Sequence, residues 1–351
     1  PSNYYYGYIS YKQGNYTEAL KSFREVEKSE IYHPVVPYYI ASIYFQQQKY
    51  DEVLSYASAL KTGDKMQYMM EMQQLIGKSY FEKGQYDKAM PYFTAYMSGV
   101  PKLNKSDVYE IGFCQYQAKN YSDAINSFKE LNVLKDSLGQ NALYLLGDCY
   151  VKTNQKNNAR LAFEEASKMD FDKFVQEHAS FQFAKLSYEL NYHDVSVKAL
   201  QEFIAAYPKS DFADEAKEYL TLEFLSTENY KDALEVIRGM PAKNPLIRQA
   251  YQKVAYSRGT ELYNDKDYEN ALLVFDESLK NPTDAGLQAG AYFWKGETYY
   301  NQQKFDDAVK SHSQFLDLLK LKPKLPGNVS EVNAKYTLAY AFLKKENYNK
   351  A

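Results

Sequence analysis

The chain has 351 residues, of which 45% are hydrophobic and 25% charged, a composition that can bury a core. Its 42 basic and 45 acidic side chains are mixed along the chain, and the formal net charge is −3, which argues against a nucleic-acid protein because such proteins carry a basic stripe. The mean hydropathy of −0.61 and the lack of a long apolar run predict no membrane span in this segment.

A short motif recurs along the whole chain: an aromatic residue followed three positions later by a small residue, as in "GNYTEAL", "GQYDKAM" and "ENYKDAL". Successive copies are 34 to 43 residues apart, a period typical of proteins built from repeated supersecondary units. The copies around Ala159 and Ser196 are degenerate. In chain order, the small residues, here called anchors, are Ala19, Val53, Ala89, Ala124, Ala159, Ser196, Ala233, Ala271, Ala308 and Ala351.

Two further positions keep the same register. The residue twelve before each anchor is again small, apart from Thr221: Gly7, Ala41, Gly77, Gly112, Gly147, Ala184, Gly259, Gly296 and Ala339. The residue four after the anchor is often large, as in Phe23, Phe93, Phe128, Phe163 and Phe275. This pattern predicts a pair of helices in each unit that approach closely through their small residues.

Each unit holds two amphipathic stretches of about a dozen residues, separated by breakers such as "KQGNY". Gly or Asn in the breaker is expected to stop the first helix, and Asp, Thr or Ser after the Tyr to cap or charge the start of the second. One helical hairpin cannot bury its own apolar face, so the units are expected to stack into a solenoid.

The repeat resembles the tetratricopeptide repeat (TPR), most clearly at "GKSYFEKGQYDKAMPYF" (77–93) and "YLLGDCYVKTNQKNNARLAF" (144–163), although the Trp of the family pattern is missing from every copy. The resemblance covers essentially the whole chain. It implies an all-α TPR solenoid, a right-handed superhelix of about nine and a half repeats. The expected repeats are 1–33, 34–69, 70–104, 105–139, 140–176, 177–213, 214–251, 252–288, 289–318 and a partial tenth at 332–351.

Residues 319–331 form a connection between the ninth and tenth units. Pro323, Pro326 and Gly327 forbid a continuous helix there. We expect a plain spacer, with a hinge or a docking loop as alternatives.

The sequence predicts no catalytic, cofactor-binding or metal-binding residues, and therefore no enzyme. None of the four histidines has a second ligand at helical metal spacing, and His312 is expected to pack in the large-residue position of its repeat. Cys114 and Cys149 occupy equivalent positions in consecutive repeats, about 10 Å apart by helix packing. That is too far for a disulfide, so we expect two buried thiols.

What remains is a surface for a protein or peptide partner. In the TPR family, six positions of each first helix line a concave groove. The fifth and twelfth positions are expected to be aromatic for packing, whereas Tyr5, Tyr8, Tyr39, Phe113, Tyr219, Trp294 and Tyr340, at the sixth and ninth, are expected to face the partner. The full candidate groove is Tyr5, Tyr8, Tyr39, Phe45, Lys78, Phe81, Phe113, Tyr116, Asp148, Lys185, Tyr188, Tyr219, Tyr263, Trp294, Glu297, Tyr300 and Tyr340.

The stretch "FIAAYPKSDFADEAKEYL" (203–220) is similar to a phrase of bacterial cell-envelope TPR proteins such as BamD and YbgF. The resemblance implies a non-catalytic scaffold in a bacterial envelope assembly, periplasmic or associated with the outer membrane, with a cytoplasmic location as the alternative. A second hypothesis is a substrate-selecting or sensory arm of a larger enzyme or signalling protein. A third is self-association through open solenoid ends, because neither end shows a polar capping helix and the chain is expected to be a slice of a longer array.

Overall fold

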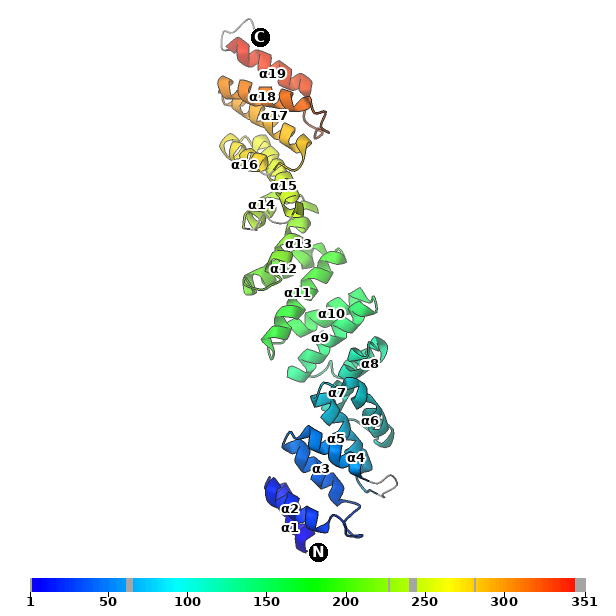
Figure 1. Ribbon diagram of the computed structural model, residues 1–351. Helices are drawn as coiled ribbons and strands as arrows, with labels where there is room; N and C mark the ends of the chain where they lie inside the picture. Colours follow the sequence, from blue (N-terminus) through cyan, green and yellow to red (C-terminus); the bar gives the residue numbers. More distant parts are fainter. Residues whose placement is uncertain (1, 61–65, 227, 240–244, 281, 345–351) are drawn as a thin grey trace. The chain divides into compact units, whose positions relative to one another are not determined.

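The computed structural model describes residues 2–60, 66–226, 228–239, 245–280 and 282–344, shown in Figure 1. Within these residues it holds nineteen helices and no strand, which confirms the all-α prediction. The anchor Ala351 and the second helix expected for the tenth repeat lie outside the described residues. The chain divides into two compact units, residues 1–183 and 184–351.

The first unit contains ten helices and the start of an eleventh: α1 (Ser2–Lys12), α2 (Tyr16–Val26), α3 (Val36–Gln46), α4 (Tyr50–Ala59), α5 (Met69–Glu82), α6 (Tyr86–Gly99), α7 (Lys105–Gln117), α8 (Tyr121–Lys129), α9 (Ser137–Lys152), α10 (Lys156–Ser167) and α11 (Lys173–Glu189). The second unit contains the end of α11 and α12 (His193–Ala206), α13 (Ala213–Ser226), α14 (Tyr230–Arg238), α15 (Pro245–Asn264), α16 (Tyr268–Lys280), α17 (Ala285–Asn301), α18 (Phe305–Leu319) and α19 (Glu331–Lys344).

Odd-numbered helices are the first helices of the predicted repeats and even-numbered ones the second. Consecutive helices such as α5 and α6 or α17 and α18 pack together as hairpins. Four first helices, α9, α11, α15 and α17, begin three to seven residues before the repeat boundaries expected at 140, 177, 252 and 289. These helices have 16 to 20 residues, so they extend further at their N-terminal ends than the expected boundaries allow.

The small residues let the two helices of a hairpin approach closely, as predicted. A Cβ atom added at Gly77 would lie 2.9 Å from the Phe93 ring, and one added at Gly259 would lie 2.5 Å from Phe275, closer than carbon atoms pack without repulsion. The pairs Gly7 with Phe23, Gly112 with Phe128 and Gly147 with Phe163 repeat this contact. All five Phe side chains are at most 2% exposed, so each hairpin has the same aromatic core.

The turn between the two helices of each hairpin has one conformation throughout. At the same register, five residues before the anchor, all nine turns place a residue at φ between 57° and 76°: Gly14, Gln48, Gly84, Lys119, Asn154, Asn191, Glu228, Lys266 and Gln303. In each turn the amide of the next residue donates to the carbonyl five positions earlier, at 2.7–2.9 Å, which is the mark of a Schellman cap. Gly or Asn was expected to end the first helix, and at this left-handed position the expectation holds for four turns and is wrong for the other five.

The acidic residues after the Tyr charge the second helices rather than cap them. Asp51 and Asp87 lie in the first turns of α4 and α6, and neither helix has a side-chain hydrogen bond at its N-cap. A carboxylate in this position interacts favourably with the positive end of the helix dipole. A side-chain cap occurs at α14, where the Asn229 Oδ1 accepts from the Asp232 amide.

Buried glutamines join some repeats to the next. Gln140 and Gln252, both fully buried, lie seven residues before Gly147 and Gly259 in the first helices. The Gln140 amide donates to the Met169 carbonyl at 2.7 Å and accepts from the Asp172 amide at 2.7 Å, and so satisfies the loop that leads to α11. Gln252 bonds the loop before α17 in the same way, through Thr283 and Asp284.

Residues 320–330 are not helical, as predicted for the Pro/Gly connection. The connection packs against α17, where Cβ atoms at Gly286 and Gly290 would collide with the Lys324 carbonyl and lie 3.2 Å from the Pro326 ring. Leu325 joins the core cluster around Phe293. The segment is therefore a packed part of the second unit.

Candidate protein-binding surface

All seventeen predicted groove residues lie on first helices, but their exposure differs. Tyr5 is 60% exposed and Tyr340 is 40% exposed, whereas Tyr39 is buried. The other fourteen are half-buried, so one side of each packs against the helices and the other reaches the surface. The residues of the two units form separate sets.

Five of the aromatic candidates pack against the aromatic residue that opens the second helix of their own hairpin. The ring centroids lie 5.5–5.9 Å apart in the pairs Phe45–Tyr50, Phe81–Tyr86, Tyr116–Tyr121, Tyr263–Tyr268 and Tyr300–Phe305. This confirms the packing role expected at the twelfth position. It also explains part of the Tyr excess, because the recurring Tyr of the motif is a partner in four of these pairs.

Other candidates connect one first helix to the next. The ring of Phe113 on α7 lies 5.7 Å from that of Phe81 on α5, in an edge-to-face arrangement. In the second unit, Tyr188–Tyr219 and Tyr263–Trp294 make similar contacts, both at 4.8 Å. Pairs at these distances add stability beyond their buried area. The half-buried candidates therefore form rows of rings along consecutive first helices of each unit.

Tyr39 corrects the prediction that it faces a partner. Its side chain is 8% exposed, and its ring stacks on that of Phe23 at 5.4 Å and meets those of Tyr8 and Tyr68 edge-on. One face of Phe23 covers Gly7, and Tyr39 covers another part of the same ring, so Tyr39 extends the core between the first two hairpins. Burial, with a hydrogen bond to Tyr68, raises the pKa of the Tyr39 hydroxyl.

Polar candidates are tied to neighbouring repeats. The Tyr116 hydroxyl donates to the Asp148 carboxylate at 2.7 Å, and burial together with this carboxylate raises the pKa of Tyr116. In the second unit, the Lys185 ammonium lies 2.8 Å from Glu215, to which Tyr219 also donates. These bonds fix the half-buried side chains in one orientation.

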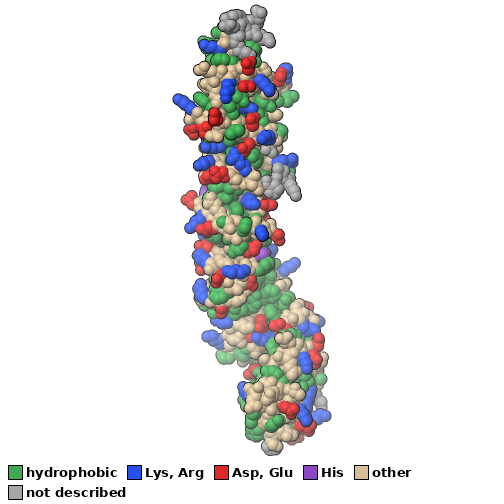
Figure 2. Space-filling model, turned by 90° about the vertical axis from the view of Figure 1, so that its left-hand side faces the viewer, with side chains coloured by type: hydrophobic (Ala, Val, Ile, Leu, Met, Phe, Trp, Pro, Cys, Tyr) green, Lys and Arg blue, Asp and Glu red, His purple; other side chains and the backbone are tan. Residues whose placement is uncertain are grey.

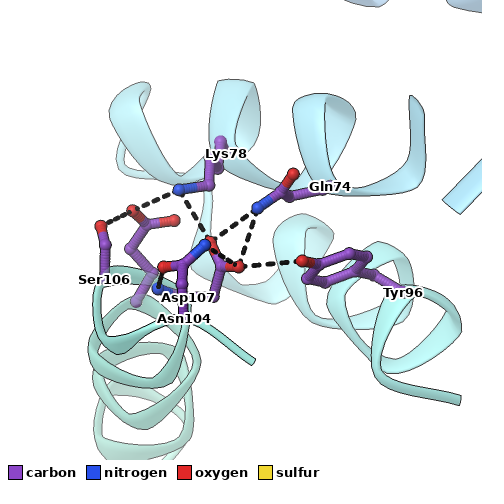
Figure 3. A network of polar contacts seen from close by, with 7 residues as sticks. Gln74, Lys78, Tyr96, Asn104, Ser106 and Asp107 are labelled. Atoms are coloured by element: carbon purple, nitrogen blue, oxygen red, sulfur yellow. Dashed lines mark hydrogen bonds and ion pairs between the residues drawn. The ribbon is translucent and has the colours of Figure 1, made fainter. Parts of the chain in front are cut away.

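Lys78 belongs to a buried network between α5, α6 and α7, shown in Figure 3. The network centres on Asp107, whose side chain is fully buried. Its carboxylate accepts from the Lys78 ammonium and the Gln74 amide at 2.8 Å, from the Tyr96 hydroxyl at 3.0 Å and from the Asn104 amide at 2.6 Å. Burial and the Asp107 charge raise the pKa of Tyr96 to about 12.

Glu110 is the second carboxylate on Lys78, at 3.0 Å, and it also accepts from the Ser106 hydroxyl. Its other oxygen, Oε2, is buried without a hydrogen-bond partner among the described residues. Burial raises the pKa of Glu110 despite the neighbouring ammonium. The pKa of Lys78 is also raised, because its two carboxylates outweigh the effect of its own burial. Lys78 is therefore held by the fold, and its ammonium is not available to a partner in this arrangement.

Sequence reasoning missed Asp107, Gln74 and Tyr96. The one signal in the sequence is Asn104 three residues before Asp107, a helix-start pattern in which the Asn104 oxygen accepts from the Asp107 amide. That pattern predicts where α7 begins, but it does not show that the carboxylate is buried between three helices.

Both cysteines are buried and free, as predicted, and burial raises the pKa of each thiol to about 12, which keeps them protonated at neutral pH. Across the described residues, no group of three or more His, Cys, Asp or Glu side chains could hold a metal ion, and no helix is long and apolar enough to cross a membrane. On the face shown in Figure 2, Lys and Arg side chains alternate with Asp and Glu rather than forming a patch of one sign.

Comparisons with known proteins agree with the repeated hairpins. One tetratricopeptide repeat model matches residues 71–98 and 140–173, and another matches residues 256–326. No curated protein sequence matches the chain significantly.

Solved structures with similar hairpins include three TPR-type proteins. MamA is 21% identical, with 46% of this chain and 90% of MamA covered at a TM-score of 0.38. A tetratricopeptide repeat protein from Parabacteroides merdae is 13% identical, with coverages of 78% and 99% and a TM-score of 0.39. YrrB, described as a TPR protein with an unusual peptide-binding site, is 14% identical, with coverages of 57% and 100% and a TM-score of 0.47.

The hairpins outside the matched ranges repeat the same features as those inside them. Gly7 and Phe23 in the first hairpin and Gly112 and Phe128 in the fourth make the same close contact as Gly77 and Phe93. The chain therefore contains tetratricopeptide repeats at residues 71–98, 140–173 and 256–326, and the hairpins between and before them have the same construction.

Proposed function

We propose that the chain is a non-catalytic scaffold that binds a peptide or a helix of a partner protein along the first helices of its first unit. The proposal rests on one feature, here called the Phe113 face: the half-buried side chains of Phe81, Phe113, Tyr116 and Asp148 on α5, α7 and α9. Phe113 on α7 contacts both Tyr116 on the same helix and Phe81 on α5, so the three rings offer a partner a continuous aromatic surface with the Asp148 carboxylate beside it.

The physical case for the Phe113 face is its preorganisation. Phe113 contacts the rings of Phe81, Tyr86, Tyr109 and Tyr116, so its orientation is set before a partner arrives. A ring that is already fixed loses little conformational entropy on binding, and aromatic residues dominate the binding energy of many protein interfaces. An apolar side chain of the partner would cover the exposed part of the rings, in the manner of a helix in a groove.

Site-specific photo-cross-linking tests the proposal in cells of the source organism. A photoreactive phenylalanine analogue is placed at Phe113, and a matched control places it at Tyr92, a half-buried ring on the second helix α6 that stacks on Tyr80. We expect a discrete adduct from position 113 that unlabelled protein competes away, and none from position 92. Equal cross-linking from the two positions, or none from position 113 at native abundance, would contradict the proposal.

The finer proposal is that this scaffold serves a bacterial cell-envelope assembly, as the phrase at 203–220 suggests. In the structure, α12 ends at Ala206 before Pro208, and the Ser210 hydroxyl accepts from the Phe212 amide just ahead of α13. This local geometry supports the reading of the phrase as a helix stop followed by a helix start. Fractionation of source cells tests the location. Recovery of the protein only in the cytosolic fraction would reject the envelope role, but it would not bear on the proposal that a partner binds at the Phe113 face.

A further inference from the structure

A groove of about 620 Å³ lies in the second unit, lined mainly by α16, α17 and α18. Leu273 and Glu277 on α16 and Lys310 and Gln314 on α18 are each spaced four residues apart, so each pair lies on one face of its helix. The remaining wall is α17, which contributes Tyr292, Lys295 and Tyr299.

This groove opens on the other side of α17 from the predicted partner-binding residues. Trp294 comes two positions after Tyr292, which lines the groove, and Glu297 comes two positions after Lys295, which also lines it. Two residues turn an α-helix by about 200°, so the two sets project in nearly opposite directions. The groove is therefore separate from the candidate groove of the first helices, and an inference about it goes beyond the proposed function.

Most charges in the groove are neutralised by neighbours. The Arg238 guanidinium makes a two-pronged contact with Glu277, at 2.7 and 3.1 Å. The Lys295 ammonium pairs with Asp276. Such pairs hold both partners in place and leave little net charge for a ligand.

Two ammonium groups in the groove are different. Lys280 and Lys310 are exposed, and neither has a carboxylate oxygen within ion-pair distance in the part of the chain that the structure describes, although the Lys280 charge acts on Glu277 from farther away. Among the carboxylates that line the groove, Asp307 is the one that has no ion-pair partner among the described residues. The same groove is lined by the Leu273 side chain, which is 62% exposed and offers an apolar surface beside the charged groups.

We propose that this groove binds an extended acidic segment of a partner protein. Its carboxylates would pair with Lys280 and Lys310, and a neighbouring large apolar side chain would cover Leu273. Charge complementarity selects the occupant, because the two unpaired lysines of the groove outnumber its one unpaired carboxylate. An acidic peptide would pair with both ammonium groups, so neither would be buried without a partner. The exposed Leu adds contact area that free anions cannot use.

Fluorescence anisotropy tests the proposal with the full chain and a fluorescein-labelled peptide of Glu and Leu residues separated by Ser. We expect saturable binding, weakened about tenfold when Lys280→Gln and Lys310→Gln are combined, since each partly exposed pair contributes modestly. Leu273→Ser also weakens binding. Asp307→Asn strengthens it, because it removes the one unpaired negative charge.

The matched control is Lys253→Gln with Lys266→Gln, which removes the same charge from exposed lysines outside the groove. We expect it to leave binding unchanged. If the control variant loses as much affinity as the groove variant, the peptide is held by general charge attraction and the proposal is overturned. If a peptide with Gln in place of Glu binds equally well, charge plays no part and the proposal is overturned too. The proposal would also be overturned if the protein failed to bind the peptide but bound anionic vesicles, and if Leu273→Ser did not weaken the vesicle binding.

Discussion

The turns inside the hairpins offer a sharp test of how this sequence specifies its fold. Lys119 ends α7 in the left-handed conformation, at φ 61°, and Gly84 holds the equivalent position after α5, at φ 68°. We expect Lys119→Gly to stabilise the protein and Gly84→Ala to destabilise it. The first change relieves a strained backbone, and the second introduces the same strain.

The magnitude follows from two opposing effects. A side chain in the left-handed region costs about 1–2 kcal/mol, whereas glycine loses about 0.5–1 kcal/mol more backbone entropy on folding. Lys119→Gly should therefore gain about 0.5–1 kcal/mol, and Gly84→Ala should lose a similar amount. Packing does not interfere, because the nearest atom to a Cβ at Gly84 would be the Tyr86 hydroxyl at 3.9 Å, an ordinary contact.

Urea unfolding followed by circular dichroism measures these changes as shifts of the midpoint at constant slope. The control is Ala118→Gly, one residue earlier, where φ is −74° and glycine relieves no strain, so we expect a loss of stability. Hydrogen exchange of the α7 and α8 amides would localise the effect, since repeat arrays open locally. Loss of stability in Lys119→Gly as large as in Ala118→Gly would refute the reasoning.

Three further predictions concern buried polar groups. His312 occupies the position of the core Phe and is fully buried, its Nδ1 has no hydrogen-bond partner in the described structure, and its Nε2 lies 3.3 Å from the Glu297 carboxylate. His312→Phe combined with Glu297→Gln, which removes both poorly satisfied groups together, should raise the free energy of unfolding by about 1–3 kcal/mol in thermal or urea unfolding. Gln140→Leu should lower it by about 2–4 kcal/mol, because the Met169 carbonyl and Asp172 amide lose their partner, and hydrogen exchange should show the loop before α11 opening first. Glu110 has a raised pKa in the folded state, so the folded protein holds its proton more tightly than the unfolded one, and this residue's contribution to stability falls as pH rises above 4.5 towards the raised value. Stability profiles from pH 4 to 8 should therefore decline less steeply in Glu110→Gln than in the wild type, and identical slopes would contradict this assignment.

The hairpin architecture could be predicted from the sequence because its determinants are local. Gly77 and Phe93 belong to one hairpin and lie sixteen residues apart, so a fixed spacing is enough to place them in contact. The connection at 320–330 was equally predictable, since Pro323, Pro326 and Gly327 lie within five residues and together disfavour a continuous helix.

The turn residues show where residue preference stops being informative. Gln48, Lys119 and Glu228 adopt the left-handed conformation that Gly14 and Gly84 adopt without strain. The Schellman hydrogen bonds and the packing of the two helices determine the turn, so the side chain at that position is free to vary at a modest cost.

The surface could be predicted only in part, because contacts between repeats decide which face of a ring is covered. Tyr39 and Phe113 were both expected to face a partner, yet the Phe23 ring covers Tyr39 while Phe113 stays half-buried. The Asp107 network brings together residues of three helices, and no spacing in the sequence indicates that its carboxylate lies between them.

The central claim is that a partner binds at the Phe113 face. Isothermal titration calorimetry of the cross-linked partner, once identified, against the wild type, Phe113→Ala and Tyr92→Ala tests it most directly. We predict that Phe113→Ala weakens binding at least tenfold, as for an aromatic residue at the centre of an interface, while Tyr92→Ala, which removes a ring of similar burial from α6, leaves the affinity unchanged. Equal affinities for all three proteins would contradict the claim.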